Sequence, residues 1–247
     1  MDTQRFLEQW NKYFPNAELP LGFYYTDQPG DITLADPVDK HRCVICDLAK
    51  VRRGSPLAFN NKRLGCGGGR RYFGFTQDLA PRFEYFLSCG IEGQLEGERY
   101  KRTPELVKEL LEILPDFEAP GKYIIFKRWD QLAADDKPIA AIFFATPDVL
   151  SGLFTLAGFD QSALEAVYTP FSAGCGSIVH YPYVEAVTGR NRPVLGMFDV
   201  SARPCVPGNV LTLTIPLAKL ESMVGYMDES FLITESWNKV RKRIAEK

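Results

Sequence analysis

The chain has 247 residues, of which 45% are hydrophobic and 24% are charged. These proportions are those of an ordinary globular protein, which excludes disordered, collagen-like and coiled-coil chains. Lys and Arg number 29 against 31 Asp and Glu, so the net charge of -2 disfavours nucleic-acid binding through bulk positive charge. Six Cys against two His favour a site built on thiols over a zinc site built on histidines.

The first ten residues contain no apolar segment followed by a small-residue cleavage site, so we expect no secretory signal. No run approaches the roughly 18 apolar residues of a membrane-spanning helix, and the longest candidate, 138–146, has the length of a strand. We therefore expect a cytoplasmic protein without a membrane partner, in which thiols are reduced. Its cysteines are then core residues, metal ligands or nucleophiles before they are disulfides.

Hydrophobic spacing and turn residues define the elements of the first half of the chain. They predict helices at 3–14, 43–53 and 81–89, strands at 21–27 and 56–59, and a loop rich in Asp, Pro and Gly at 28–40.

Two helices of the second half share one start signal. Thr103-Pro104-Glu105 and Thr146-Pro147-Asp148 each give an N-cap Thr, a Pro at the first helical position and an acid in the first turn. The other predicted elements are strands at 123–126, 139–145, 194–198 and 210–215 and helices at 173–187, 216–223 and 231–244.

Alternating helices and strands predict an α/β or α+β fold with a mixed β-sheet and flanking helices. We expect strands 123–126 and 139–145 to be antiparallel neighbours. Residues 1–247 are predicted to form a single domain, and the Gly- and Pro-containing stretch 115–121 is where two subdomains would meet.

Four cysteines occur within a short part of the first half. Cys43 and Cys46 form a C-x-x-C pair on a predicted helix, His41 precedes them, and Cys66 and Cys89 follow. Two thiols one helical turn apart can share a metal ion, and four thiolates can hold a [4Fe-4S] cluster. The alternative is that most of these residues are buried, unliganded thiols.

A basic region surrounds the glycine run at 65–69. Between residues 50 and 77 there are seven Lys and Arg residues and no acidic residue. If a helix begins here, the amides of Gly67, Gly68 and Gly69 could bind an anion, and Arg70 or Arg71 could add a bidentate contact. The alternative is a tight turn with a solvated basic face. The same charge would favour the thiolate form of Cys66.

Cys175 opens a predicted helix among small residues, in a sequence whose outline resembles a nucleophile elbow. The nearby base, His180, lies about 140° around the helix from Cys175, so the two would not face each other. The alternative is a helix start whose small residues permit close packing. Further on, Asp199 and Ser201 are typical turn and cap residues, and Arg203 could bind an anion or pair with Asp199.

Together these motifs resemble the domain of unknown function 169 family, which is prokaryotic and common in anaerobes and archaea. The resemblance covers roughly residues 5–225. The matching residues are Cys43-x5-Ala49, Gly54, Cys66-Gly67-Gly68, Gly74, Phe171-Ser172-x-x-Cys175, Pro182, Thr188-Gly189 and a strand at 210–215 that ends in Pro216.

The resemblance implies no reaction, but it divides the cysteines into those that match the family pattern and those that do not. Cys43, Cys66 and Cys175 match recurring cysteines of the family, whereas Cys46 and Cys89 do not, which favours one site built from distant segments. Many members carry a further cysteine soon after the Leu-Gly before the last strand; here Met197 follows Leu195-Gly196, which puts a four-thiolate site in doubt. Cys46, Cys89 and Cys205 are therefore interpreted as bystanders that take no part in the site.

The sequence thus predicts a protein that binds a ligand or cofactor, and the expected partner is a small anionic molecule or a cofactor. Its pocket is lined by cysteines, glycines and arginines and could hold a metal ion or an iron-sulfur cluster. The predicted metal ligands are Cys43, Cys66 and Cys175, and the predicted ligand-binding residues are Gly67, Gly68, Gly69, Arg70, Arg71 and Arg203. The alternative is an enzyme with Cys66 or Cys175 as nucleophile, acting on a small anionic molecule. An RNA-binding module is the least favoured of the three hypotheses. The sequence does not decide whether the protein forms a homo-oligomer.

Overall fold

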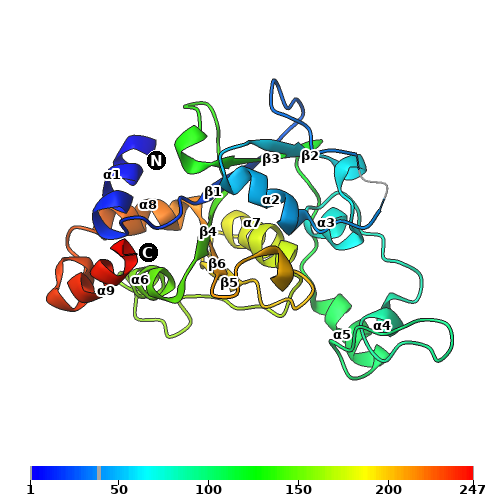
Figure 1. The fold of residues 1–247 in the computed structure, drawn as a ribbon. Coiled ribbons are helices and arrows are strands. Elements are labelled where there is room, and N and C mark those ends of the chain that lie inside the picture. The colour runs from blue at the N-terminus through cyan, green and yellow to red at the C-terminus, as the bar shows by residue number, and fades with distance from the viewer. Residues whose placement is uncertain (1, 38–39, 247) are drawn as a thin grey trace.

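The computed structural model describes residues 2–37 and 40–246. Its centre is a six-stranded sheet in the order β2-β3-β1-β4-β6-β5, in which every neighbouring pair of strands is antiparallel (Figure 1). The strands are β1 (Leu21–Thr26), β2 (Leu57–Phe59), β3 (Tyr123–Arg128), β4 (Ala140–Ala145), β5 (Val194–Gly196) and β6 (Leu211–Pro216). With helices around this sheet, the predicted mixture of helices and strands is confirmed.

The predicted pairing of strands 123–126 and 139–145 is wrong. β1 lies between β3 and β4 and pairs with both, so that Leu21 is opposite Arg128 on one side and Ile142 on the other. The connection between β3 and β4 passes the start of β1, because the Trp129 amide donates to the carbonyl of Pro20. A strand from a distant part of the chain therefore occupies the place that a hairpin partner would take.

Helices cover both faces of the sheet (Figure 1). One face packs against α1 (Thr3–Tyr13), α6 (Pro147–Ala157), α8 (Leu217–Tyr226) and α9 (Glu235–Ala245), and the other against α2 (Val44–Arg52), α3 (Gly67–Tyr72) and α7 (Tyr181–Val187). β4 shows why two layers form: Ala140, Ile142 and Phe144 are buried on one face, and the residues between them are buried on the other. A strand that is apolar on both faces needs helices on each side.

Most helix boundaries follow the sequence signals. The Thr103 side chain accepts a hydrogen bond from the Leu106 amide and caps α5 (Pro104–Ile113), as predicted. The predicted helix at 81–89 is reduced to one turn, α4 (Phe83–Phe86). The predicted helix at 173–187 begins with a π-helical turn, Gly176–His180, before α7.

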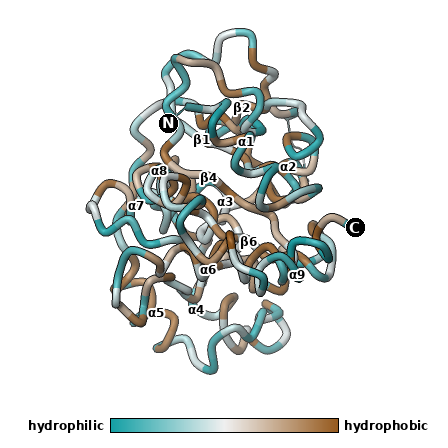
Figure 2. Tube along the Cα trace, turned by 90° about the vertical axis from the view of Figure 1, so that its left-hand side faces the viewer, coloured by the Kyte–Doolittle hydropathy of each residue, from teal (hydrophilic) through white to brown (hydrophobic). Residues whose placement is uncertain are grey.

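Residues 77–114, here called the outer segment, contain α4 and α5. Figures 1 and 2 both show these two helices at one end of the molecule, away from the sheet. α5 has one fully buried side chain, Val107, and exposes Leu106 and Ile113. Within residues 2–37 and 40–246, no helix combines the length and the apolar character that crossing a membrane requires.

Candidate functional site

Cys43, Cys66 and Cys175 line one cavity of about 280 Å³, here called the thiol cavity. Cys43 is the N-cap of α2, Cys66 is the N-cap of α3, and Cys175 directly precedes the π-helical turn. The structure therefore brings together three thiols from three distant segments. Gly68 lies beside Cys175, because a Cβ atom at Gly68 would be 3.8 Å from the Cys175 Sγ.

The glycine run forms the first turn of α3 and packs tightly around Cys66. The Gly69 amide donates a hydrogen bond of 3.1 Å to the Cys66 Sγ, so it is not free for an anion. A Cβ atom at Gly69 would lie 2.9 Å from the same sulfur, which explains the glycine there. Gly67 faces open space and does not line the cavity.

Small residues also permit the close packing around Cys175. A Cβ atom at Gly176 would lie 2.1 Å from the Ser172 Oγ, and one at Gly174 would lie 2.9 Å from the Cβ of Ala202. Both distances are shorter than a normal non-bonded contact. The small residues beside Cys175 therefore serve close packing.

The three predicted arginines do not line the thiol cavity. Arg70 is exposed, and Arg71 donates to the carbonyl of Gln77. Arg203 donates to the carbonyls of Pro207 and Gly208 at 3.2 and 2.8 Å, and not to Asp199. Of the six residues predicted to bind a ligand, only Gly68 lies on the cavity wall.

Asp199 organises the polar wall of the cavity. One carboxylate oxygen accepts from the Gly174 amide at 2.9 Å, and the other accepts from the Tyr100 hydroxyl at 2.9 Å and from the Ser201 hydroxyl at 2.8 Å. The predicted turn role of Asp199 and Ser201 is confirmed. The carboxylate also links the outer segment, through Tyr100, to the segment that carries Cys175.

Most of the apolar lining of the cavity comes from the outer segment. Its side chains are Phe83, Phe86, Leu87, Leu110, Leu111 and Leu114, with Phe171 beside them. Among the residues that the structure describes, the carboxylates of Asp199 and Glu98 line the cavity, and no Lys or Arg does. The cavity thus suits an apolar group next to thiols and hydroxyls.

Sequence reasoning missed the contribution of the outer segment, although one signal was present. The periodic leucines of α5 predict a helix with an apolar face, and that face covers the cavity instead of the sheet. Which surface an apolar helix face covers is decided by tertiary packing, so the pattern alone could not locate it.

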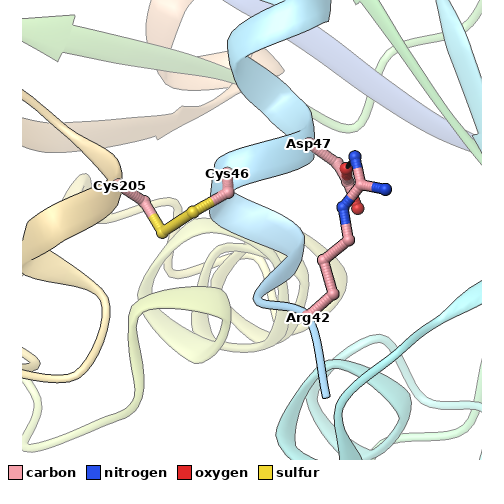
Figure 3. Close-up of a disulfide and its surroundings, with 4 residues drawn as sticks. All are labelled: Arg42, Cys46, Asp47 and Cys205. Carbon is pink, nitrogen blue, oxygen red and sulfur yellow. Dashed lines mark ion pairs between the residues drawn. A yellow bond between two sulfur atoms is a disulfide. The ribbon is translucent and has the colours of Figure 1, made fainter. Parts of the chain in front are cut away.

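Cys46 and Cys205 form a disulfide, which corrects the prediction that both are unpaired bystanders. Figure 3 shows the bond between α2 and the turn Arg203–Cys205. The two Cα atoms are 4.8 Å apart, although 159 residues separate them in sequence. The bond ties together two walls of the thiol cavity, because Cys43 begins α2 and Ala202 lies just before Cys205. Cys89 is an exposed free thiol outside this site.

An ion pair between Arg42 and Asp47 lies on the other side of α2 from the disulfide (Figure 3). The Asp47 side chain is only 8% exposed. Burial raises its pKa above the usual value, and the Arg42 charge opposes that rise. The pair holds the segment before Cys43 against the first turn of the helix.

Burial dominates the electrostatics of the thiols. It raises the pKa of the Cys175 thiol well above its ordinary value, and the neighbouring Cys66 and Cys43 thiols add to the rise. Burial also raises the pKa of Cys43. Cys175 is therefore a protonated thiol at neutral pH. Among the residues that the structure describes, no three His, Cys, Asp or Glu side chains are arranged to hold a metal ion.

The two histidines differ in their relation to the site. His41 lines the cavity and is exposed. The His180 Nε2 lies 2.9 Å from the carbonyl of Pro115, outside the cavity lining. Burial lowers the pKa of His180 to about 4, so its ring is neutral at physiological pH. His180 is therefore not placed as a base for Cys175.

Comparison with known proteins gave one result. The family profile of DUF169, described as uncharacterised ArCR, matches residues 15–225. No curated protein and no solved structure gives a significant match. Because the matched region spans most of the chain and includes the three cavity cysteines, the protein belongs to the domain of unknown function 169 family.

Proposed function

We propose that this protein binds a small molecule with an apolar body in the thiol cavity. The observation that carries the proposal is the convergence of Cys43, Cys66 and Cys175 on one cavity whose other lining residues are mainly apolar. A concave, mainly apolar site with a few convergent polar groups is typical of a binding site for a small organic ligand.

The lining also indicates which end of such a ligand enters. Asp199 and Glu98 would repel an anionic group, and no Lys or Arg of the lining would attract one. The apolar end of a ligand therefore suits this cavity better than an anionic end. Thiols are weakly polar and behave much as small hydrophobic groups toward such a ligand.

A cavity-filling substitution tests the proposal. Gly68 lines the cavity and has normal backbone geometry for any residue, whereas its neighbour Gly67 faces open space. We expect Gly68→Leu to weaken binding of the neutral fluorophore phenylnaphthylamine about tenfold or more, and Gly67→Leu to leave it unchanged. Fluorescence titration measures both. Absence of binding to the wild-type protein, or equal effects of the two variants, contradicts the proposal.

The metal or iron-sulfur form of the site stays a prediction. Thiolates are good ligands for zinc, copper(I) and iron-sulfur clusters. A metal would have to draw the thiols into a closer arrangement than the described residues show. Anaerobic purification followed by iron, zinc and sulfide analysis tests this form, and protein without metal under those conditions overturns it.

A cysteine nucleophile is the second candidate, and one contact favours Cys66 for the role. Its sulfur accepts a hydrogen bond from the Gly69 amide, which fixes the sulfur on the cavity wall. Burial raises the pKa of the Cys175 thiol and keeps it protonated, which disfavours Cys175 as the nucleophile. If Cys66 is a nucleophile, iodoacetamide modifies it faster than the exposed Cys89, as mass spectrometry of the digested protein would show. Slower modification of Cys66 contradicts this candidate.

We propose the cytoplasm as the compartment of this protein. There the Cys46–Cys205 disulfide would meet reducing thiols, and cytoplasmic disulfides are commonly redox-active. Oligomeric state stays a prediction that sedimentation would decide.

A further inference from the structure

A second cavity, of about 440 Å³, adjoins the thiol cavity. The two share three lining residues, Leu110, Leu114 and Phe171. The second cavity is here called the basic cavity, because Lys101, Arg190 and Arg192 line it and Glu185 is its one acidic residue. This local excess of positive charge contrasts with the net charge of -2 of the whole chain.

Glu185 positions the two guanidinium groups without neutralising the cavity. Its side chain is 1% exposed and accepts from Arg192 at 2.8 Å and from Arg190 at 3.2 Å. One carboxylate cannot balance two guanidinium groups and the ammonium of Lys101. Because Arg190 remains 52% exposed, its unused donors can reach a ligand in the cavity.

Aromatic rings hold the other two cations in place. The Lys101 Nζ lies 3.9 Å from the centre of the Phe171 ring, and the Arg192 guanidinium lies 4.6 Å from the centre of the Tyr168 ring. Such contacts are favourable and restrict where the charge can sit. Tyr168 and Tyr181 also line the cavity, and each carries a hydroxyl group. These hydroxyls can donate to an acceptor.

We propose that the basic cavity binds the anionic group, a carboxylate or a phosphate, of an amphipathic small molecule. Its apolar part lies against the three shared residues and occupies the thiol cavity. This inference rests on the proposed function and adds the chemical class of the ligand. Guanidinium groups bind carboxylates and phosphates through paired hydrogen bonds, and the tyrosine hydroxyls supply further donors.

Calorimetric titration with matched probes tests the inference. Octanoate and octyl phosphate carry the anionic group, octanol carries only the chain, and inorganic phosphate carries only the anion. We expect octanoate or octyl phosphate to bind at least tenfold more tightly than octanol and than inorganic phosphate. Whichever of these two amphipathic anions binds more tightly identifies the anionic group as a carboxylate or a phosphate.

Replacing single lysines by methionine then tests where the anionic group binds. Lys101→Met keeps the aliphatic stem over Phe171 and removes the charge. We expect this substitution to lower the affinity for octanoate or octyl phosphate about fivefold to tenfold. Octanol and phenylnaphthylamine should bind to this variant as they do to the wild type. Lys108→Met is the control, because Lys108 is exposed on α5 outside both cavities. Arg190→Gln should act like Lys101→Met.

The outcomes separate this inference from the proposed function. Equal affinity for octanol and both amphipathic anions, or equal effects of Lys101→Met and Lys108→Met, overturns the anionic subsite while phenylnaphthylamine binding still supports the thiol cavity. Absence of binding by phenylnaphthylamine and by all the alkyl probes overturns both.

Discussion

His180 is one residue whose ionisation couples stability to pH. Burial holds its pKa at about 4 in the folded protein, against an ordinary value of 6.5. Between these values the unfolded chain binds a proton that the folded chain does not. The stabilisation that His180 contributes is therefore fully present above about pH 6.5. It is lost as the pH falls toward 4, which lowers the free energy of unfolding by up to about 3 kcal/mol.

Urea denaturation at about pH 7.5 and about pH 4.5 measures this loss. His180→Gln should be less stable at the higher pH but should lose less on acidification than the wild type. His41→Gln is the matched control, because it removes the chain's other histidine, which is exposed. If His180→Gln and the wild type lose the same free energy, another group controls the acid sensitivity.

Single residues also show what local sequence can reveal about the site. The glycines beside Cys66 and Cys175 mark places where the chain is closely packed, so those two cysteines stand out in the sequence. The role of Arg203 could not be deduced. Its long side chain turns to the carbonyls of Pro207 and Gly208, and a side chain's direction depends on what surrounds it in the fold.

Among the elements, α2 carries the strongest restraint on the cavity. The disulfide from Cys46 to Cys205 closes a long loop, and removing a native disulfide typically costs about 2–5 kcal/mol. We expect Cys46→Ser with Cys205→Ser to lower the free energy of unfolding by this amount. Phenylnaphthylamine should also bind more weakly, because the disulfide no longer holds two walls of the thiol cavity together.

Urea denaturation with and without a dithiol reductant checks the effect. The reductant should destabilise the wild type and leave the double variant unchanged. Cys89→Ser is the matched control, because Cys89 is an unpaired surface thiol. Equal stability of the wild type with and without the reductant would show that the bond contributes nothing or does not form in solution.

The sequence predicted where helices and strands begin and end better than it predicted which strands pair with one another. The Thr-Pro-acid signals correctly place the starts of α5 and α6, because such a signal depends on neighbouring residues alone. The Thr103 side chain caps α5, whereas α6 begins at Pro147 without a side-chain hydrogen bond from Thr146. The position of β1 between β3 and β4 was not predictable, because pairing depends on segments about a hundred residues apart. The disulfide was missed for the same reason: nothing local to Cys46 indicates Cys205.

On the scale of the whole molecule, both cavities lie where the outer segment meets the helices on one side of the sheet. α5 contributes lining residues to both, although it packs little of its own surface elsewhere. A ligand in the thiol cavity would therefore add contacts to α5 that the free protein lacks. Segments with few buried contacts open readily, and added contacts suppress that opening.

Hydrogen exchange should detect this effect. We expect phenylnaphthylamine at saturating concentration to slow amide exchange in residues 104–114 and to leave the exchange of β4 and β6 unchanged. Those strands are central in the sheet and are protected in the free protein as well. Slowing in the strands but not in α5 would place the probe elsewhere.

The disulfide has one further consequence for the outer segment. Cys46 and Cys205 turn residues 46–205 into a covalent ring, and residues 77–114 lie inside it. A protease that nicks the backbone there opens the ring but cannot release either fragment. The nicked molecule should migrate as one species on a non-reducing gel and as two after reduction. Its two pieces would stay tethered near both cavities, so a cleaved protein need not be an inactive one.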